Sequence, residues 1–472
     1  MSRGSCEATR RNADPSSAAD STHEKKQGRD QTNPSVIKIG AEEMTAKRMN
    51  NTGGRLWTVM VYMVGDYTNL DNNGFADLKE MKKAGSSPEV ALLAQFSRGV
   101  KNRPTNRYYL TKSGREGALA DDVVAKLGRI ETSSPEALAD FIGWGVENFP
   151  ARHYMLIMWG HGNGADDEKL PASSRPVHQP DDSLPEPLAQ TRDSLQMTWR
   201  DRQGSKGIAL GYATVDSQTV DFLDSRRFKK ALAAASRRVG RKIDILGMDA
   251  CLMSGIEVCY QVRDSVDFTV APEGFSPLDG WPYDKILTEL VKKPWLEPKK
   301  LARVIVKKYL AAYADYEDVC VTQSICDLDR CPSLVGAADS LAKTLITHLP
   351  DVEVRKAIIL ARWQVQAYEG TDYVDLYDFC CLLEQNCEQA EVKDACQSVM
   401  NIIARENFVV ESVYRGVSAQ YSYGLSIYFP LTEISAFYQR LDFAQQTVWV
   451  EFLKEFQRAT RRPERVKPKP MA

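Results

Sequence analysis

The sequence has little net charge, no long apolar run and only five histidines among its 472 residues. Its formal net charge of −2 argues against a nucleic-acid partner and a membrane partner, because both attract chains with a large excess of basic residues. No apolar run reaches the roughly 18–20 residues that a membrane-spanning helix needs. The basic residues at the start of the chain are not followed by an apolar stretch, so we expect no secretory signal. The expected location is the cytoplasm, with export by another route left open.

The ten cysteines are too few for a disulfide scaffold in a chain of this length. A zinc site is not expected either, because the cysteines of the second half show no CxxC spacing beside a histidine. Most of them stand among apolar residues, as is typical of small buried side chains in a reducing compartment. These cysteines are Cys320, Cys326, Cys331, Cys380, Cys381, Cys387 and Cys396.

Both ends of the chain are polar. Residues 1–54 are rich in Ser, Asn, Asp, Lys and Arg and have almost no large apolar side chains, so they are expected to be disordered. Met44 and Met49 lie just ahead of the first apolar run and are alternative starts. Residues 461–472 form a basic, Pro-rich tail that is expected to be loose.

Apolar runs alternate with helical patterns between residues 57 and 272. The run Trp57–Gly65 is continuous and β-prone, as in a strand that is buried on both faces. Further runs follow after segments with helical spacing, at Val90–Phe96, His153–Trp159, Ile243–Asp249 and Val266–Pro272. This alternation predicts βαβ units, and hence an α/β fold with a mostly parallel central sheet.

The pattern is interrupted once and changes once. Residues 165–206 contain prolines, acidic pairs and serines without periodicity, which indicates a long functional or disordered loop. After about Pro282 helical patterns dominate, and two further strand-like runs appear at Phe408–Tyr414 and Tyr423–Pro430. We therefore divide the chain into an α/β part at 55–290 and a mixed α/β C-terminal part at 291–460. The second part is either a domain of its own or an elaboration of the same sheet.

Two reactive side chains follow predicted strands. In LIMWGHGNG, His161 comes just after the strand that ends at Trp159, and in DILGMDACLMS, Cys251 comes just after the strand that ends at Asp249. The carboxyl ends of parallel strands meet at one edge of a sheet, where such folds collect ligands and catalytic groups. A histidine in a Gly-rich loop is more often merely exposed, and a cysteine at a strand–helix junction is more often buried and inert. Their coincidence at one edge favours a reactive pair.

This pair has the elements of nucleophilic catalysis. A thiolate is a strong nucleophile, and a nearby imidazole supplies or takes its proton. The pattern LMSGIEVCYQV predicts a helix that begins at Cys251, where the helix dipole would favour the thiolate. The amides of Gly162 and Cys251 are suited to hold an oxyanion, and glycine lets a substrate backbone approach closely.

From Trp57 onward the sequence resembles the clostripain family of cysteine peptidases, which belongs to the same clan as caspases, legumain and gingipains. The resemblance rests on WTVMVYM…NLD, LIMWGHGNG, DILGMDACLMSGIEV, GWPYDKIL and GLSIYFP, and it extends over about residues 55–456. It implies a caspase-like α/β/α sandwich with a Cys–His dyad, in which His161 and Cys251 occupy the catalytic positions. It also implies cleavage after arginine or lysine, so that residues 55–290 would be the catalytic domain.

Cleavage after a basic residue requires an acidic pocket. Asp249 matches the aspartate that the family has two residues before the nucleophile, and a second acidic residue is expected on the loop after the next strand. In APEGFSPLDGW, Asp279 is the first choice for it and Glu273 the second. The structural alternatives are that Asp249 caps the following helix and that Asp279 is an ordinary turn residue. Pro272 stands where members often have serine, which puts the local pocket wall in doubt.

The resulting prediction is an endopeptidase that cuts peptides or proteins after Arg or Lys and needs no cofactor for its chemistry. Many members of the family cut themselves between the two catalytic blocks, so we expect self-processing within 165–206, and a monomer or a self-cleaved two-chain form. Whether this protein binds calcium is left open. Some members of the family respond to calcium, but the acidic residues of this loop lack a fixed ligand spacing and are expected to be solvated. These residues are Asp166, Asp167, Glu168, Asp181 and Asp182. The alternatives are a catalytically silent module that binds basic peptide segments, and a thiol enzyme with another acyl substrate.

Overall fold

The structure is a computed structural model. It describes residues 37–38, 54–65, 70–98, 104–112, 118–162, 164, 213–216, 219–316, 319–368 and 372–460, and Val36–Ala472 form one compact unit. The segments predicted to be disordered, looped or loose, at 1–54, 165–206 and 461–472, lie outside the described residues apart from the short strand β1 (Ile37–Lys38) and Gly54.

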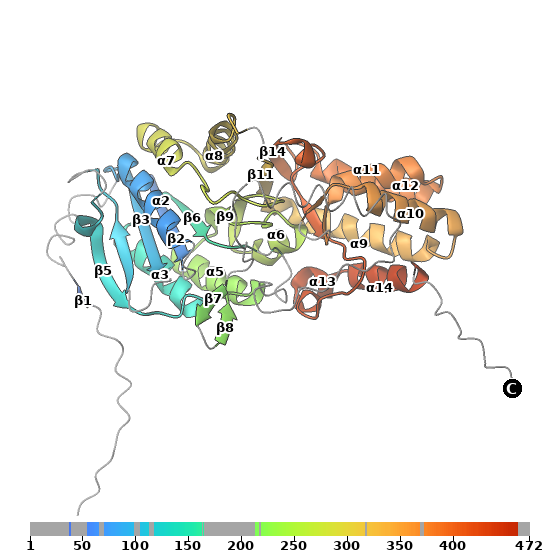
Figure 1. The fold of residues 1–472 in the computed structure, drawn as a ribbon, viewed down its shortest axis with the longest axis horizontal. Helices are drawn as coiled ribbons and strands as arrows, with labels where there is room; N and C mark the ends of the chain where they lie inside the picture. Colours follow the sequence, from blue (N-terminus) through green and yellow to red (C-terminus); the bar gives the residue numbers. More distant parts are fainter. Residues whose placement is uncertain are drawn as a thin grey trace, which may run out of the picture. The chain divides into compact units, whose positions relative to one another are not determined.

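A ten-stranded sheet forms the centre of the compact unit (Figure 1). In spatial order its strands are β1, β5 (Val123–Gly128), β4 (Thr105–Tyr109), β3 (Val90–Arg98), β2 (Trp57–Gly65), β6 (His153–Trp159), β9 (Ile243–Asp249), β10 (Val266–Ala271), β11 (Val321–Asp327) and β14 (Val409–Arg415). The five strands from β3 to β10 run parallel, and the strands on both flanks pair antiparallel. The predicted α/β fold is confirmed, with its parallel part at the centre of the sheet.

Helices cover both faces of this sheet. Along β2, Met60 and Tyr62 pack into one hydrophobic cluster and Val59 and Val61 into another, because successive side chains of a strand point to opposite faces. The cluster around Met60 is completed by α3 (Pro135–Asn148), α5 (Ser225–Val239) and α6 (Ile256–Val262), and the cluster around Val59 by α2 (Asp71–Ala84), α7 (Tyr283–Lys292) and α8 (Pro298–Ala312). The architecture is therefore the expected α/β/α sandwich.

The part of the chain after residue 290 extends the same sheet, since β11 and β14 both come from it. It also contributes a group of helices and a small three-stranded sheet, whose buried side chains join the cluster around Met60. The helices are α9 (Cys331–His348), α10 (Val352–Gln364), α11 (Leu376–Asn386), α12 (Ala390–Ile403), α13 (Asp442–Gln446) and α14 (Trp449–Thr460). The strands are β12 (Ala367–Tyr368), β13 (Tyr373–Asp375) and β15 (Ser426–Tyr428). A separate hairpin is formed by β7 (Ala213–Asp216) and β8 (Thr219–Phe222).

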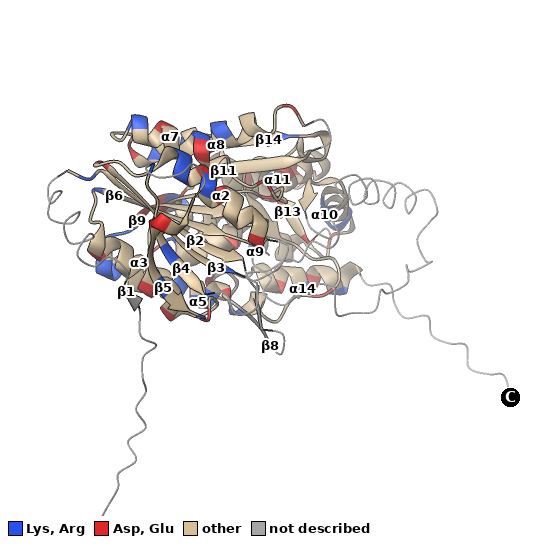
Figure 2. Cartoon of the chain, turned by 60° about the vertical axis from the view of Figure 1, so that its left-hand side comes forward, with Lys and Arg blue, Asp and Glu red and all other residues tan. Residues whose placement is uncertain are grey.

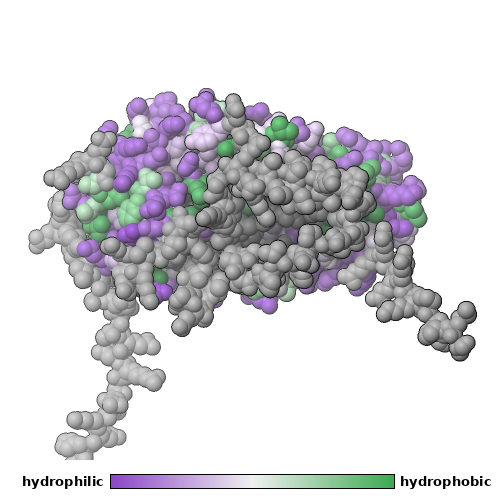
Figure 3. All heavy atoms as spheres, in the orientation of Figure 1, coloured by the Kyte–Doolittle hydropathy of each residue, from purple (hydrophilic) through white to green (hydrophobic). Residues whose placement is uncertain are grey.

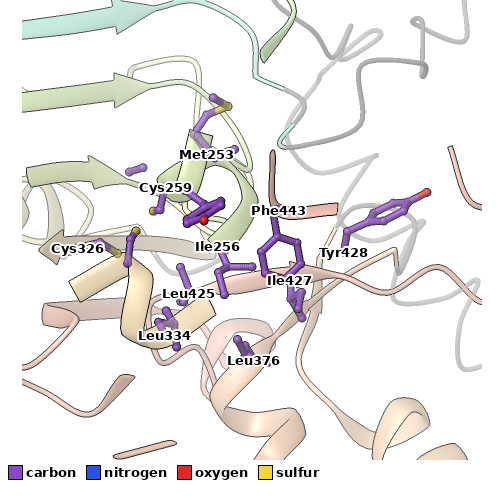
Figure 4. Close-up of a cluster of buried hydrophobic side chains, with 14 of the residues drawn as sticks. Met253, Ile256, Cys259, Cys326, Leu334, Leu376, Leu425, Ile427, Tyr428 and Phe443 are labelled. Atoms are coloured by element: carbon purple, nitrogen blue, oxygen red, sulfur yellow. The ribbon is translucent and has the colours of Figure 1, made fainter. Parts of the chain in front are cut away.

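Side chains from both parts meet beside α6 in one buried group (Figure 4). Ile256 and Cys259 of α6 lie there with Leu334 of α9 and Ile427 of β15. The backbones are joined too, because the amide of Ser426 donates a 2.8 Å hydrogen bond to the carbonyl of Ser254. The segment just after Cys251 is thus held from the C-terminal part of the chain.

The described surface is mainly hydrophilic in the view of Figure 3, with hydrophobic residues in small groups. Basic and acidic residues are interspersed over the helices rather than collected by sign (Figure 2). Among the described helices we find none that combines the length and the apolar character needed to cross a membrane.

Candidate active site

His161 and Cys251 lie at the same edge of the sheet, as predicted. Strands β6 and β9 are parallel neighbours, and Trp159 pairs with Asp249 at their carboxyl ends. His161 and Cys251 each follow two residues later, and the amide of Gly160 donates to the carbonyl of Asp249 at 3.3 Å, which prolongs the ladder. The hydrogen-bond register of the sheet therefore brings the imidazole and the thiol to neighbouring positions.

The glycine after His161 allows this close approach. A Cβ atom on Gly162 would lie 2.2 Å from the carbonyl oxygen of Cys251 and 2.9 Å from its amide nitrogen. Both distances are far below van der Waals contact, so any side chain at this position would push the two loops apart. Gly162 is thus required because its backbone rests on the backbone of Cys251.

The environment of Cys251 differs from the prediction in one respect. The helix expected to begin at Cys251 begins at Ile256, after Gly255 as its N-cap, and Leu252 adopts a left-handed conformation with φ of 64°. Tertiary hydrogen bonds are the reason: the amide of Leu252 donates to the carbonyl of Gly274, and that of Ser254 to the carbonyl of Pro272. The proposed stabilisation of the thiolate by a helix dipole is therefore wrong.

A backbone amide contacts the sulfur instead of a helix N-terminus. The amide of Ser276 donates a hydrogen bond to the Sγ atom of Cys251 at 3.3 Å. A hydrogen bond to the charged form of a thiol favours that form, so the loop after β10 provides what the helix was expected to provide. Cys251 itself is buried, with 8% of its surface exposed.

His161 is buried as well, with 9% of its surface exposed. Burial lowers the pKa of His161 to about 4, because the charged imidazolium loses its hydration. The imidazole is therefore neutral near neutral pH and able to accept a proton from the thiol.

Asp249 is held in place by two hydrogen bonds, one from just before α7 and one from the first residue of α7. Its Oδ2 atom accepts from the amide of Trp281 at 3.1 Å and from the hydroxyl of Tyr283 at 2.9 Å. These bonds come from Trp281 and the start of α7, and not from α6, the helix that follows Asp249, so the alternative of a helix cap is wrong. Burial raises the pKa of Asp249 to about 6, although both hydrogen bonds oppose this. The other oxygen, Oδ1, has no hydrogen bond with the described residues.

Asp279 is exposed and lies in a turn that closes over Asp249. The turn needs glycine at its end: Gly280 has φ of +57°, and a Cβ atom there would lie 2.8 Å from Oδ2 of Asp249. Two hydrogen bonds fix the turn. Asn73 Nδ2 donates to the carbonyl of Leu278 at 2.9 Å, and the hydroxyl of Tyr313 donates to the carbonyl of Gly280 at 2.7 Å. The two predicted aspartates are thus brought to one place, one beneath the turn and one on it.

Glu273, the second choice for the pocket, is fully buried elsewhere in this loop. Its Oε2 atom accepts from the amide of Gly424 at 2.8 Å, and its carboxyl group is hydrogen-bonded to that of Asp375. Burial and the neighbouring carboxyl raise the pKa of Glu273 well above its ordinary value, and burial raises the pKa of Asp375 to about 7. The hydrogen bond from Gly424 to Glu273 ties the loop beside Cys251 to the C-terminal part.

Sequence reasoning missed Asp77, a buried acid on α2. Its Oδ2 atom accepts a 2.6 Å hydrogen bond from the Nε1 atom of Trp159, the last residue of β6. A signal for its burial is present in the sequence, because Asp77 follows Gly74 by three residues and precedes Met81 by four, on the buried stripe of α2.

The part of the chain that the structure describes contains no group of three or more His, Cys, Asp or Glu residues that could hold a metal ion. The acidic residues considered for calcium, Asp166 to Asp182, lie outside it.

Known proteins resemble this chain in sequence. Clostripain from Hathewaya histolytica is 26% identical to it over an alignment of 274 residues, and the match covers 53% of this chain and 44% of the relative. The match thus spans less than half the length of that relative. The model of the clostripain family matches residues 61–184 and 198–456, a range that includes His161, Cys251 and Asp249.

Solved structures share its fold. A secreted C11 cysteine protease from Bacteroides thetaiotaomicron, in complex with an irreversible peptide inhibitor, superposes with a TM-score of 0.56 at 18% identity, covering 85% of this chain and 99% of that one. An inactive zymogen C11 protease from Parabacteroides distasonis gives a TM-score of 0.54 at 17% identity, with 84% and 99% coverage. The family model covers most of the chain and includes the segments of His161 and Cys251, so this chain belongs to the clostripain family.

Proposed function

We propose that this protein is a cysteine endopeptidase that cleaves peptide bonds after arginine or lysine through Cys251 and His161. The observation that carries the proposal is the seating of Gly162 on the backbone of Cys251, with both reactive side chains two residues beyond paired strand ends. Membership of the clostripain family supports the same activity.

The reaction begins with transfer of the thiol proton of Cys251 to the neutral imidazole of His161. The thiolate attacks the carbonyl carbon of the scissile bond, and the amides of Gly162 and Cys251 hold the oxyanion that forms. His161 then gives its proton to the leaving amine, and an acyl-enzyme remains on the sulfur. Water, deprotonated by His161, attacks this thioester, and the thiolate leaves with return of the proton.

Specificity for a basic residue follows from the buried carboxyl of Asp249. A guanidinium or ammonium group loses hydration on entering the site, and a charge-assisted hydrogen bond with a carboxylate offsets this loss. The free Oδ1 atom of Asp249 is suited to this bond, since Oδ2 is already held by Trp281 and Tyr283. Asp279, on the turn above, adds a second negative charge that remains exposed to solvent.

The test is hydrolysis of a matched set of fluorogenic peptides with arginine, lysine or citrulline before the cleaved bond. We expect cleavage of the arginine and lysine peptides, weak cleavage of the citrulline peptide, and loss of all activity after treatment with a thiol-alkylating reagent. A catalytically silent module that binds basic peptides would cleave none of them. A thiol enzyme for another acyl substrate would show alkylation-sensitive activity without preference for the positive charge.

We further propose that the protein cuts itself between the two catalytic blocks. Residues 165–206 contain or adjoin six basic residues that its own specificity would recognise: Lys169, Arg175, Arg192, Arg200, Arg202 and Lys206. Strand β6 precedes this segment and β9 follows it, and the two pair along Met155–Trp159. A cut would therefore leave two chains that remain joined through the sheet.

The expected result is two chains in a denaturing gel of the purified wild-type protein that elute as one species in its native state. The Cys251→Ala protein should remain a single chain under the same conditions. A wild-type protein that is fully active as one intact chain would contradict self-processing and leave the peptidase proposal standing.

A further inference from the structure

Asp77 is a buried acid that has no role in the reaction described above. It lies in the second turn of α2, with 4% of its surface exposed. One of its oxygens accepts the 2.6 Å hydrogen bond from Trp159. Among the described residues it has no second hydrogen bond and no ion pair with a lysine or arginine. Its other carboxyl oxygen is thus left without a protein partner there.

The surroundings of Asp77 are acidic. Asp249, Glu80 and Asp279 all lie close enough to raise its pKa further, after the larger effect of burial, and the resulting pKa is about 9. Tyr283, whose hydroxyl donates to Asp249, lies near the charges of both Asp77 and Asp249. Helix α2 also supports the turn above them through the hydrogen bond of Asn73 to Leu278. The geometry agrees, because Trp159, whose Nε1 atom donates to Asp77, is the register partner of Asp249 on the neighbouring parallel strand. Asp77 and Asp249 therefore belong to one acidic site, with Asp77 on α2 and Asp249 at the end of β9.

Two buried carboxylates beside each other are unfavourable unless a proton or a cation joins them, because each charge loses hydration and the two repel. If this residue only had to accept the hydrogen bond of Trp159, an asparagine at position 77 would do so equally well. An aspartate at position 77 has a function when the positive side chain of a substrate lies between the two carboxyl groups. A guanidinium group donates several hydrogen bonds in fixed directions and can bond to both.

We propose that Asp77 is a specificity-determining residue that binds the basic side chain of the substrate together with Asp249. This inference rests on the proposed function, because it names a further group of the same site. Burial and the nearby acidic groups favour the protonated form of Asp77 in the free enzyme. The arriving cation displaces this proton to solvent, and the carboxylate that remains bonds to the bound side chain. A substrate without positive charge leaves the proton in place.

The discriminating variant is Asp77→Asn, because its amide oxygen still accepts the hydrogen bond of Trp159 while the charge is lost. We expect kcat/KM for arginine and lysine peptides to fall about tenfold or more, mainly through KM. Cleavage of the citrulline peptide should change little. In the wild type the KM of the arginine peptide should fall as pH rises toward about 9, because Asp77 loses its proton more readily. This dependence should be absent from the variant.

A matched control is Asp71→Asn on the same helix. Asp71 is buried to a similar degree, but it is already paired with Arg98 at 2.5 Å. The ratio of arginine to citrulline cleavage should therefore stay at the wild-type value in this variant, whatever happens to its stability. Equal ratios in wild type and Asp77→Asn would overturn the proposal and leave Asp77 as an anchor of Trp159.

A second measurement needs no change at Asp77. Calorimetric titration of the Cys251→Ala protein with an arginine peptide, in two buffers of different ionisation heat at about pH 8, counts the protons released on binding. We expect close to one proton for the arginine peptide, and release of none would overturn the proposal.

The outcomes for the proposed function and for the assignment of Asp77 are distinguishable. A wild-type enzyme that cleaves arginine and citrulline peptides equally, or cleaves neither, contradicts the proposed function itself. Discrimination that Asp249→Asn abolishes and Asp77→Asn preserves contradicts only the assignment of Asp77.

Discussion

Peptide hydrolysis is expected to vanish when Cys251 is replaced by alanine, because in the proposed reaction the Sγ atom forms the acyl-enzyme bond and nothing else in the described site replaces it as a nucleophile. His161→Ala should lower kcat by about 10²–10⁴-fold, the usual contribution of a positioned acid–base group. The measurement is kcat and KM on the arginine peptide, with thermal unfolding to show that each variant is folded. The close contact of Gly162 with Cys251 is made by backbone atoms, so both variants should fold.

Cys259→Ala is the matched control for this experiment. Cys259 is fully buried on α6 with its sulfur 3.7 Å from the hydroxyl of Thr269, and it does not belong to the catalytic pair. Its replacement should lower the unfolding temperature slightly and leave kcat/KM near the wild-type value. Activity retained by Cys251→Ala, or lost equally in Cys259→Ala, would contradict the assignment of the nucleophile.

Asp249→Asn is expected to lower kcat/KM for arginine and lysine peptides by about 30-fold or more, since removing one partner of a buried charged pair costs about 2–5 kcal/mol. The amide oxygen of asparagine still accepts the hydrogen bonds of Trp281 and Tyr283, so the fold should persist. Asp279→Asn should have a smaller effect of the same kind, because its charge is exposed and screened by water. The citrulline peptide serves as the reference substrate.

The acidity of Asp249 adds a pH dependence to this prediction. Its pKa in the folded protein is about 6, so the carboxylate predominates above that pH and is neutralised below it. Cleavage of the arginine peptide relative to the citrulline peptide should therefore fall as pH drops through about 6. If Asp249→Asn loses arginine and citrulline cleavage by the same factor, Asp249 is structural, and the preference for basic residues has another origin.

The central strands could be predicted from the sequence because they are buried on both faces. The runs Trp57–Gly65, His153–Trp159 and Ile243–Asp249 coincide with β2, β6 and β9, since a strand covered by helices on both sides is apolar throughout. Strand β11 was not predicted. Its segment Thr322–Ser324 is polar yet buried, and its hydroxyls bond to the loops around Glu273 and Ser254, which no local pattern reveals.

The start of α6 was predicted wrongly for a related reason. The residues after Cys251 have helical spacing, but their backbone amides donate to Pro272 and Gly274, which lie about twenty residues later. Local pattern and tertiary hydrogen bonds compete here, and the tertiary bonds prevail. The same competition gives the thiol its hydrogen bond from Ser276 instead of a helix dipole.

The site itself was predictable only where its residues follow strand ends. His161 and Cys251 each stand just after an apolar run, so the topology of parallel strands brings them together. Asp77 comes from a helix between two other strands, and Glu273 meets Asp375 about a hundred residues away in the chain. Such pairings depend on packing between distant elements, and a sequence without its structure does not show them.

The most direct test of the nucleophile and its specificity is the intact mass of the protein after reaction with an arginine-bearing irreversible inhibitor whose electrophile takes the place of the cleaved bond. We predict one adduct for the wild type, found on the peptide that contains Cys251, and none for Cys251→Ala. The citrulline analogue of the inhibitor should react far more slowly. An adduct on one of the other nine cysteines, or equal labelling by both inhibitors, would contradict a Cys251 peptidase that recognises basic residues.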